Sequence, residues 1–368
     1  MNKILAILCG VGLGAIAAVV GYIVLHKDTR EDPPAEKKPT PSNPSPEIAE
    51  TKVESKVVLD SLDTPCGMAL QPETGHLFIS LKDRIVRVVP GEPYTVHDEI
   101  TGFPTDHFGR GPSYQFGPLG LAFADKNTLI VGDGSQEDGK EIVRIYTVDL
   151  QPVPRDKVRK AEDMTSFSTP IPPGEESLQG EGNFFGVALH GSTVFITCNG
   201  DDSKGWIAKM ELDLKKPAPL TLIPFIKSKE LTDTNAPMGA TMSPDGKLVV
   251  CQFGPTNGSP DSLLTSYDPA TGKLEKKYKT GLRNLINVAY DPKTGKLYGL
   301  DFSWAAPKEG GLYRFEPGAD KLKVVNRATL VKPTALAFTP TGQLYVTVLG
   351  AETKNGKKSG QLLVFKEF

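Results

Sequence analysis

A repeat of about fifty residues runs through this chain from near residue 56 to its end, and it constrains the fold more than any other feature. Each period opens with a short apolar segment, turns at a Gly- or Asp-containing dipeptide, and continues into further apolar segments. The second residues of the six openings lie 53, 66, 53, 48 and 48 positions apart. The openings are Cys66–Leu70, Leu119–Phe123, Phe185–Leu189, Met238–Met242, Ile286–Tyr290 and Thr334–Phe338. Periods of this length are typical of propeller blades or solenoid units.

The fourth period predicts four short strands joined by turns. They are expected at Ala240–Met242, Leu248–Cys251, Leu263–Tyr267 and Glu275–Thr280, with a tight turn at Ser243–Lys247 after the first. The first two are apolar at almost every position, as in strands buried on both faces, whereas the last two alternate more. Four strands per unit with a tight turn after the first indicate a propeller blade rather than a helical repeat.

The two ends of the repeat predict how the ring closes. The last period stops after its third strand, Leu362–Phe365, and only three residues follow. Lys56–Asp60 is predicted to form a strand before the first period begins. Adding this strand to the sixth blade would pair the edge of that sheet, which is otherwise unpaired. We therefore predict an all-β, six-bladed propeller of four-stranded blades over residues 56–368, closed by its N-terminal strand.

An uncharged run of 22 residues, Ile4–Leu25, lies near the start of the chain. At 1.5 Å per residue a helix of this length reaches about 33 Å, enough to cross a hydrocarbon core of about 30 Å. Residues 1–25 are therefore predicted to be a transmembrane signal anchor. A cleaved signal peptide is the alternative, because Ala15–Ala17 resembles a cleavage site, although the apolar run continues beyond it.

Residues 26–55 are predicted to be a disordered, proline-rich linker, because they contain almost no apolar side chains that could form a core. A short N-terminal span, a spacer and one large C-terminal domain predict a propeller in the periplasm or outside the cell, attached to the membrane through residues 4–25. The charges that flank the span do not define its orientation. A net charge of −2 predicts no nucleic-acid partner.

The repeat also carries a recognisable pattern, Pro-x-Gly-φ-Ala … Pro-Asp-Gly-x-Leu-φ-Val … Ile-φ-Arg-φ, where φ is an apolar residue. This pattern resembles the six-bladed propeller superfamily of NHL-repeat, SMP-30/gluconolactonase-like and glucose/sorbosone dehydrogenase-like proteins. The resemblance covers residues 56–368 and is one of fold, which by itself does not define an activity.

The long loops of the repeat are predicted to share one face. Strands alternate in direction within a blade, so the loop after each second strand and the loop between blades emerge on the same side. Binding residues usually lie on loops that a rigid scaffold holds. We therefore favour a binding module over an enzyme, with a loop-rich face that contacts an unknown protein or saccharide. The candidate ligand-binding residues are Arg110, Tyr114, Asp133, Glu181, Asn183, Asn235, Asn284, Asp301 and Trp304, with Phe116 and Phe184 as further aromatic contacts.

One alternative is a quinoprotein sugar dehydrogenase. For such an enzyme the resemblance implies pyrroloquinoline quinone (PQQ), a His that acts as a base on the substrate hydroxyl, and Arg or Lys residues that hold the quinone. His107, which precedes an FGP turn, and Arg283, which precedes a first strand, are the residues that would fill these roles.

A second alternative is a metal-dependent lactonase of the SMP-30 type. Here the resemblance implies a calcium-like ion held by Glu, Asn and Asp residues at the openings of first strands. The residues at those positions include no carboxylate or carboxamide: Cys66, Leu119, Phe185, Met238, Ile286 and Thr334. Glu181, Asn183 and Asn235 lie a few residues upstream and could reach inward. We predict no metal site at the pore and no cofactor.

Overall fold

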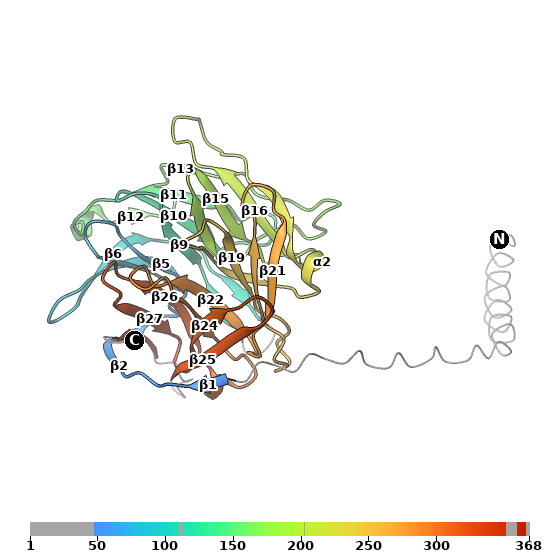
Figure 1. Cartoon of the computed structure of the whole chain (residues 1–368). Helices are drawn as coiled ribbons and strands as arrows, with labels where there is room; N and C mark the ends of the chain where they lie inside the picture. The colour runs from blue at the N-terminus through green and yellow to red at the C-terminus, as the bar shows by residue number, and fades with distance from the viewer. Residues whose placement is uncertain (1–47, 110–112, 202, 351–358, 366–368) are drawn as a thin grey trace, which may run out of the picture. The chain divides into compact units, whose positions relative to one another are not determined.

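The computed structural model describes residues 48–109, 113–201, 203–350 and 359–365, which form an all-β propeller of six blades (Figure 1). Each blade is a four-stranded antiparallel sheet, and the first strands of neighbouring blades contact one another around the centre. The six-bladed propeller expected from the repeat is confirmed.

The first three blades are built from twelve strands. They are β3 (Met68–Leu70), β4 (Leu77–Leu81), β5 (Arg84–Val89) and β6 (Thr95–Thr101); β9 (Pro118–Phe123), β10 (Thr128–Asp133), β11 (Val143–Thr147) and β13 (Ser166–Phe167); and β14 (Val187–His190), β15 (Thr193–Thr197), β16 (Trp206–Glu211) and β17 (Ile223–Lys227).

The last three blades are built in the same way. They are β18 (Pro237–Met242), β19 (Leu248–Gln252), β20 (Leu263–Tyr267) and β21 (Leu274–Lys279); β22 (Leu285–Tyr290), β23 (Leu297–Asp301), β24 (Gly311–Pro317) and β25 (Leu322–Thr329); and β26 (Pro333–Phe338), β27 (Leu344–Val348), β28 (Gly360–Phe365) and β2 (Ser55–Leu62).

The glycine near the start of a first strand lets neighbouring blades approach closely at the centre. A Cβ atom added at Gly67 would lie 1.9 Å from the carbonyl oxygen of Leu119, and one at Gly186 would lie 2.2 Å from that of Met238. Neither distance is sterically possible, so the repeat requires glycine at these positions. The carbonyl oxygen of Met238 also accepts a hydrogen bond from Thr197 Oγ1 at 2.6 Å.

The ring closes as the sequence predicted. Strand β2 pairs antiparallel with β28 and places Lys56 opposite Val364. At the centre, Thr334 Oγ1 donates a hydrogen bond to the carbonyl oxygen of Pro65 at 2.9 Å, which joins the sixth blade to the first. The N-terminal strand therefore completes the sixth blade and joins the two ends of the repeat.

The linker was predicted to extend to residue 55, but the structure has a β-strand within that range. Within the range 26–55 that was expected to be disordered, β1 (Ile48–Glu50) pairs in parallel with β25 on the outer edge of the fifth blade. The amide of Thr51 continues this pairing by donating to the carbonyl oxygen of Asn326 at 3.0 Å. Composition did not reveal this strand, because its hydrogen bonds come from the backbone and its side chains are exposed.

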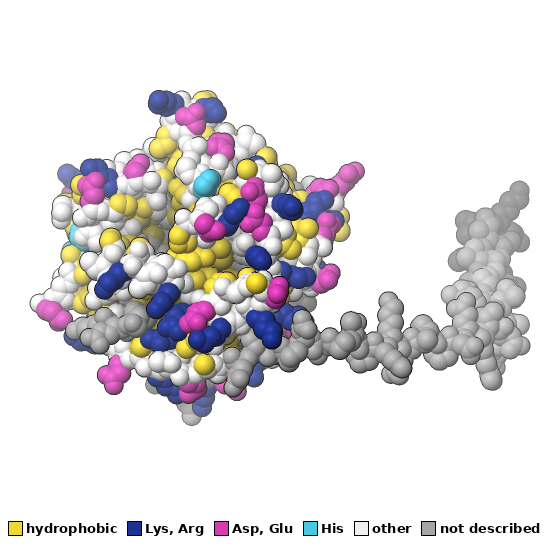
Figure 2. Space-filling view, viewed as in Figure 1, with side chains coloured by type: hydrophobic (Ala, Val, Ile, Leu, Met, Phe, Trp, Pro, Cys, Tyr) yellow, Lys and Arg dark blue, Asp and Glu magenta, His cyan; other side chains and the backbone are white. Residues whose placement is uncertain are grey.

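The core lies between the blades, and one buried ion pair contributes to it. Arg87 Nε contacts Glu99 Oε2 at 2.9 Å with both side chains fully buried, and Arg159 Nη1 contacts the other carboxyl oxygen at 3.1 Å. The Arg87 guanidinium also lies 4.7 Å from the ring centroid of Phe78, whose edge packs against Phe123 of the second blade. On the face seen in Figure 2, hydrophobic side chains gather at the centre of the ring and charged ones surround them.

Three further elements lie outside the four-stranded pattern. Strand β12 (Arg159–Lys160) pairs in parallel with β6, and β7 (Asp106–Phe108) and β8 (Tyr114–Phe116) form a hairpin that pairs only with itself among the described strands.

The helices are short: α2 (Ser228–Thr232) and the 3-10 turns η1 (Arg155–Lys157) and η2 (Pro307–Glu309). In the part of the chain that the structure describes, none is long and apolar enough to cross a membrane. The predicted span, residues 4–25, lies outside that part.

Candidate functional site

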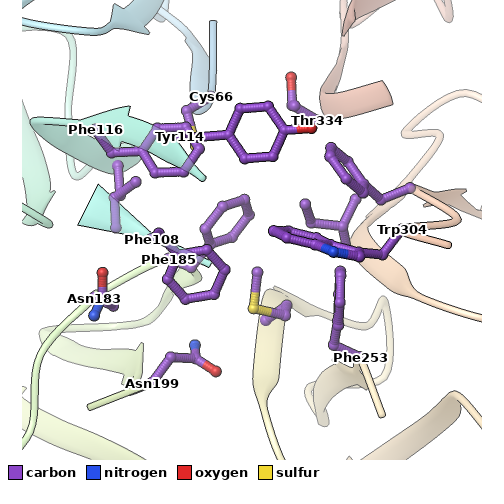
Figure 3. A pocket seen from close by; sticks show the side chains of 14 residues that line it. Cys66, Phe108, Tyr114, Phe116, Asn183, Phe185, Asn199, Phe253, Trp304 and Thr334 are labelled. Carbon is purple, nitrogen blue, oxygen red and sulfur yellow. The ribbon is translucent and has the colours of Figure 1, made fainter. Parts of the chain in front are cut away.

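A pocket lies at the centre of the ring, at the end of the propeller where the first strands begin (Figure 3). The first residue of every repeat opening lines it: Cys66, Leu119, Phe185, Met238, Ile286 and Thr334. The loops after second strands and between blades add Phe108, Tyr114, Phe116, Asn183, Asn199, Phe253, Phe302 and Trp304. The space between these residues is about 470 Å³, open solvent at the mouth included.

Trp304 lies at the centre of the aromatic wall. Its ring centroid is 5.5 Å from that of Phe302 and 6.3 Å from that of Phe253, which follow the second strands of the fifth and fourth blades. Tyr114 meets the indole edge-on at 5.6 Å, with an angle of 90° between the ring planes. Contacts of this geometry stabilise aromatic clusters and fix the orientation of the rings.

The hairpin β7–β8 brings aromatic side chains from the other side of the ring. It lies between the first and second blades, yet Phe108 reaches within 6.1 Å of the Trp304 ring in the fifth blade. Tyr114 comes within 6.2 Å of Phe302. The Tyr114 hydroxyl is buried and has no hydrogen-bond partner among the described residues. The hairpin therefore spans part of the pocket and forms one of its walls.

Two predicted contact residues, Asn284 and Asp301, instead position the Trp304 loop. Asn284 Oδ1 accepts a hydrogen bond from the Trp304 amide at 2.8 Å, and Asp301 Oδ1 accepts one from the Asn284 amide at 2.8 Å. Both side chains are buried, and burial raises the pKa of Asp301 above its ordinary value. They lie behind the pocket wall, so a ligand in the pocket would not contact them directly.

Asn183 lines the pocket and is held from behind by acidic side chains. Glu141 accepts a hydrogen bond from the Asn183 backbone amide, and Asp138 Oδ1 accepts one from Asn183 Nδ2 at 3.2 Å. Burial raises the pKa of Glu141 to about 9, and the neighbouring charge of Asp133 contributes to the rise. Glu141 is therefore neutral at pH 7, which allows a carboxyl group to remain in this interior position.

Other predicted contact residues are also structural. Asp133 is fully buried and forms an ion pair with Arg144 at 2.8 Å. Glu181 is fully buried, and its Oε1 atom accepts a hydrogen bond from Ser177 Oγ at 2.8 Å. Burial raises the pKa of Glu181 to about 8. Asn235 is half-buried beside Gly205 and does not line the pocket.

The prediction of aromatic contacts was partly wrong. Phe184 is fully buried in the core between the second and third blades, and its neighbour Phe185 lines the pocket instead. Sequence reasoning also missed Phe108, Phe253, Phe302 and Asn199 as lining residues. The last three follow second strands within two residues, and that shared position is the signal that would have identified them. Arg110 lies outside the described residues.

The two residues proposed for a dehydrogenase are not in the pocket. His107 is exposed on the hairpin, where its ring nitrogens contact Ser113 Oγ at 3.2 Å and Gln115 Nε2 at 3.1 Å. Its neighbours in the same strand alternate in direction, so the pocket receives Phe108 instead. Arg283 forms an ion pair with Glu309 and does not line the pocket either.

No protein-family model and no curated protein sequence matches the chain. Several solved structures do match the chain in fold. The aldose sugar dehydrogenase from Escherichia coli aligns with a TM-score of 0.56 and 17% identity over 86% of this chain and 99% of that one. A glucose dehydrogenase from Thermus thermophilus gives 0.54 and 16% over 85% and 100%, and a gluconolactonase-like structure gives 0.51 and 14% over 87% and 93%. The likeness is one of fold.

The groups that these folds suggest can be tested against the pocket. Among the described residues, no three His, Cys, Asp or Glu side chains are grouped so that they could hold a metal ion. The described lining contains no Arg, Lys, His, Asp or Glu, so it offers neither cations for the carboxylates of PQQ nor carboxylates for calcium. The lining as described fits neither group.

Proposed function

We propose that this protein is a membrane-tethered, extracytoplasmic binding module that holds an apolar group of its ligand in the central pocket. The observation that carries this proposal is the composition of the pocket, where eleven of the fourteen lining residues are apolar or aromatic and none is a Lys, Arg, His, Asp or Glu. A concave, largely apolar site with a few polar groups is typical of ligand binding.

The aromatic wall offers apolar surface that a ligand ring can cover. Each Å² of apolar surface removed from water contributes ~25 cal/mol, before the cost of association is subtracted. Four neighbouring rings contact the Trp304 side chain, and the Trp304 backbone amide donates a hydrogen bond to Asn284 Oδ1, so little side-chain freedom would be lost on binding. Such preorganisation favours affinity.

The proposal is tested with the neutral naphthalene dye Prodan, whose emission reports an apolar surrounding. We expect saturable binding to the wild-type protein and a loss of affinity of about tenfold or more in Phe253→Ala, because a buried aromatic contact is removed. Phe225→Ala is the matched control, since Phe225 is a half-buried ring of β17 outside the pocket. Equal affinity in both variants would contradict the proposal.

A sugar dehydrogenase is the second candidate, because several solved structures with this fold are named sugar or glucose dehydrogenases. Under this alternative the protein supplemented with PQQ would oxidise aldoses in a dye-linked assay, and His107→Ala would abolish the activity. We expect no activity above background, because His107 hydrogen-bonds within its own hairpin and points away from the lining side chains.

A further inference from the structure

Two of the six blades carry an additional strand on their outer edge. Strand β1 pairs in parallel with β25 of the fifth blade, and β12 pairs in parallel with β6 of the first blade. Both added strands are short and belong to segments that precede or connect the strands of the repeat. The outer edge of a blade in this molecule therefore accepts an extended segment through backbone pairing, a mode by which sheets also bind peptides.

The strand added to the first blade is opposite in charge to the edge that it joins. The edge strand β6 carries Asp98 and Glu99, whereas β12 consists of Arg159 and Lys160. Arg159 Nη1 lies 3.1 Å from Glu99 Oε1, between the two paired strands. Opposite charges on paired strands stabilise the pairing and like charges oppose it, so charge helps to decide which segment an edge accepts.

The outer strand of the fourth blade, β21, is basic and carries no added strand. It lies at the edge of its sheet, and no other described strand pairs with it on that side. Glu275, the one acid in β21, pairs with Lys247 at 2.7 Å. Four exposed lysines that form no ion pair with a described residue lie in this strand or directly before it: Lys273, Lys276, Lys277 and Lys279. This edge therefore presents uncompensated positive charge beside unpaired backbone groups.

Side chains on one face hold β21 in place. Lys276 Nζ and the Tyr278 hydroxyl donate hydrogen bonds at 3.2 and 2.6 Å to carbonyl oxygens of the turn between β24 and β25. Because side chains alternate along a strand, Lys277 and Lys279 lie on the opposite face, and both are exposed. The edge is thus preformed, so little backbone freedom would be lost when another strand pairs with it.

Lysine on a sheet edge opposes pairing with neutral or basic strands, whereas an acidic strand would neutralise its charge. We propose that β21 docks an extended, acidic segment of a partner protein, which adds to the fourth blade as a fifth strand. Its carboxylates would lie near Lys277 and Lys279 while its backbone pairs with the open edge. No residue of β21 lines the central pocket, so this inference is independent of the proposed function.

The probe is a fluorophore-labelled peptide of alternating Thr and Glu, about eight residues long, which is a usual strand length. Fluorescence anisotropy with the full-length protein in neutral detergent should show saturable binding at low salt. High salt should weaken this binding, because exposed charges are screened. A peptide of alternating Pro and Glu has the same charge but lacks every second N–H group, so it should bind about tenfold more weakly or not at all.

Charge reversal and hydrogen exchange locate the contact. Lys277→Glu combined with Lys279→Glu should weaken binding of the Thr-Glu peptide about tenfold, because two attractive pairs become repulsive. Lys215→Glu combined with Lys216→Glu is the matched control, since these exposed lysines lie in the connection after β16 and the change in net charge is the same. In the complex, the amides of residues 272–280 should exchange more slowly with deuterated solvent.

Equal affinity of the wild-type protein for the two peptides would show attraction by charge alone and would overturn strand addition. Absence of binding at low salt would overturn it too. Equal effects of the two double substitutions, or unchanged hydrogen exchange at residues 272–280, would place the contact elsewhere and contradict the assignment to β21. The peptide comparison uses the wild-type protein only, so it remains decisive if a variant fails to fold.

Discussion

At the scale of single residues, the repeat glycines determine how closely the blades meet. Gly186 has little tolerance for change, because a Cβ atom there would lie 2.2 Å from a backbone carbonyl oxygen that cannot move without shifting the fourth blade. Gly→Ala should therefore act as an overpacking mutation rather than as a loss of flexibility.

We expect Gly186→Ala to lower the free energy of unfolding by about 3 kcal/mol, at the upper end of the usual cost of overpacking. Urea titration followed by far-ultraviolet circular dichroism measures this. Gly174→Ala is the control, because Gly174 is exposed and a Cβ atom there would meet nothing within 4 Å. A change in Gly186→Ala no larger than in the control would show that the blades can separate at little cost.

The buried acids predict an unusual dependence of stability on pH. Glu141 and Glu181, with pKa values near 9 and 8 in the fold, are ordinary carboxyls in the unfolded chain, so the folded state binds their protons more tightly. Stability from these groups is fully present below about pH 4.5. This contribution to the free energy of unfolding falls by on the order of a few kcal/mol as the pH rises through 8. The contribution of a salt-bridged carboxylate changes in the opposite direction, because it is lost as the pH falls.

Differential scanning calorimetry from pH 5 to pH 8 measures this dependence. Glu181→Gln should flatten the decline in Tm, because glutamine keeps the shape of the side chain and its contact with Ser177 without a titrating proton. Glu175→Gln, in the same loop but exposed, should leave the profile unchanged. Parallel pH profiles for the wild-type protein and Glu181→Gln would contradict the assignment of a buried neutral acid.

The sequence predicted which residues line the pocket where the repeat defines their position in a blade. It failed where the direction of a side chain determines whether a residue lines the pocket or enters the core. The six opening residues all line the pocket, because alignment of the periods is enough to place them. Phe184 and Phe185 are adjacent in the segment before β14, where Phe184 enters the core and Phe185 lines the pocket, so an error of one residue exchanges core and pocket. Alignment of the periods places Phe185 in the pocket as an opening residue, but it does not show that Phe184 enters the core.

At the scale of elements, strand β2 holds the ring closed. Removing it would leave β28 as an unpaired edge and uncover apolar side chains of the sixth blade, whereas β1 adds three residues to the outside of the fifth blade. The two N-terminal strands should therefore differ strongly in their importance to stability. The sequence identified β2 from its apolar pattern but showed no sign of β1, whose side chains are exposed.

Three truncations test this difference. A chain beginning at residue 48 should keep the Tm of the full protein, and one beginning at Ser55 should lose a few degrees. A chain beginning at Asp63 should fail to fold cooperatively, because the sixth blade is incomplete. Thermal unfolding and analytical gel filtration provide the measurements. A cooperative transition at an unchanged temperature in the shortest chain would show that closure does not depend on β2.

At the scale of the whole molecule, the sequence predicted the architecture far better than the chemistry. Periodic apolar segments define blades, since every blade must bury the same faces, and the ends of the repeat define closure. The pocket depends on loops whose contacts are not periodic. The hairpin β7–β8, for example, reaches the fifth blade from between the first and second, and such a long-range contact of aromatic rings has no local sequence signal.

Membrane attachment through residues 4–25 stays a prediction and is open to direct test. The full-length protein should remain with the membrane fraction after alkaline carbonate extraction, and a chain beginning at residue 48 should be released. N-terminal sequencing of the mature protein provides the complementary measurement. Recovery of a soluble form that begins near Ala18 would establish cleavage after the apolar run's Ala15–Ala17 segment and would rule out a retained anchor.

The most direct test of a central aromatic binding site is a crystal structure of the protein soaked with bromoindole, in which anomalous scattering locates the bromine atom. The predicted result is a single strong peak inside the pocket, with the ring against Trp304, and loss of that peak in Trp304→Ala. Bromine bound elsewhere on the propeller, with the pocket empty in the wild-type crystal at saturating ligand, would contradict the account.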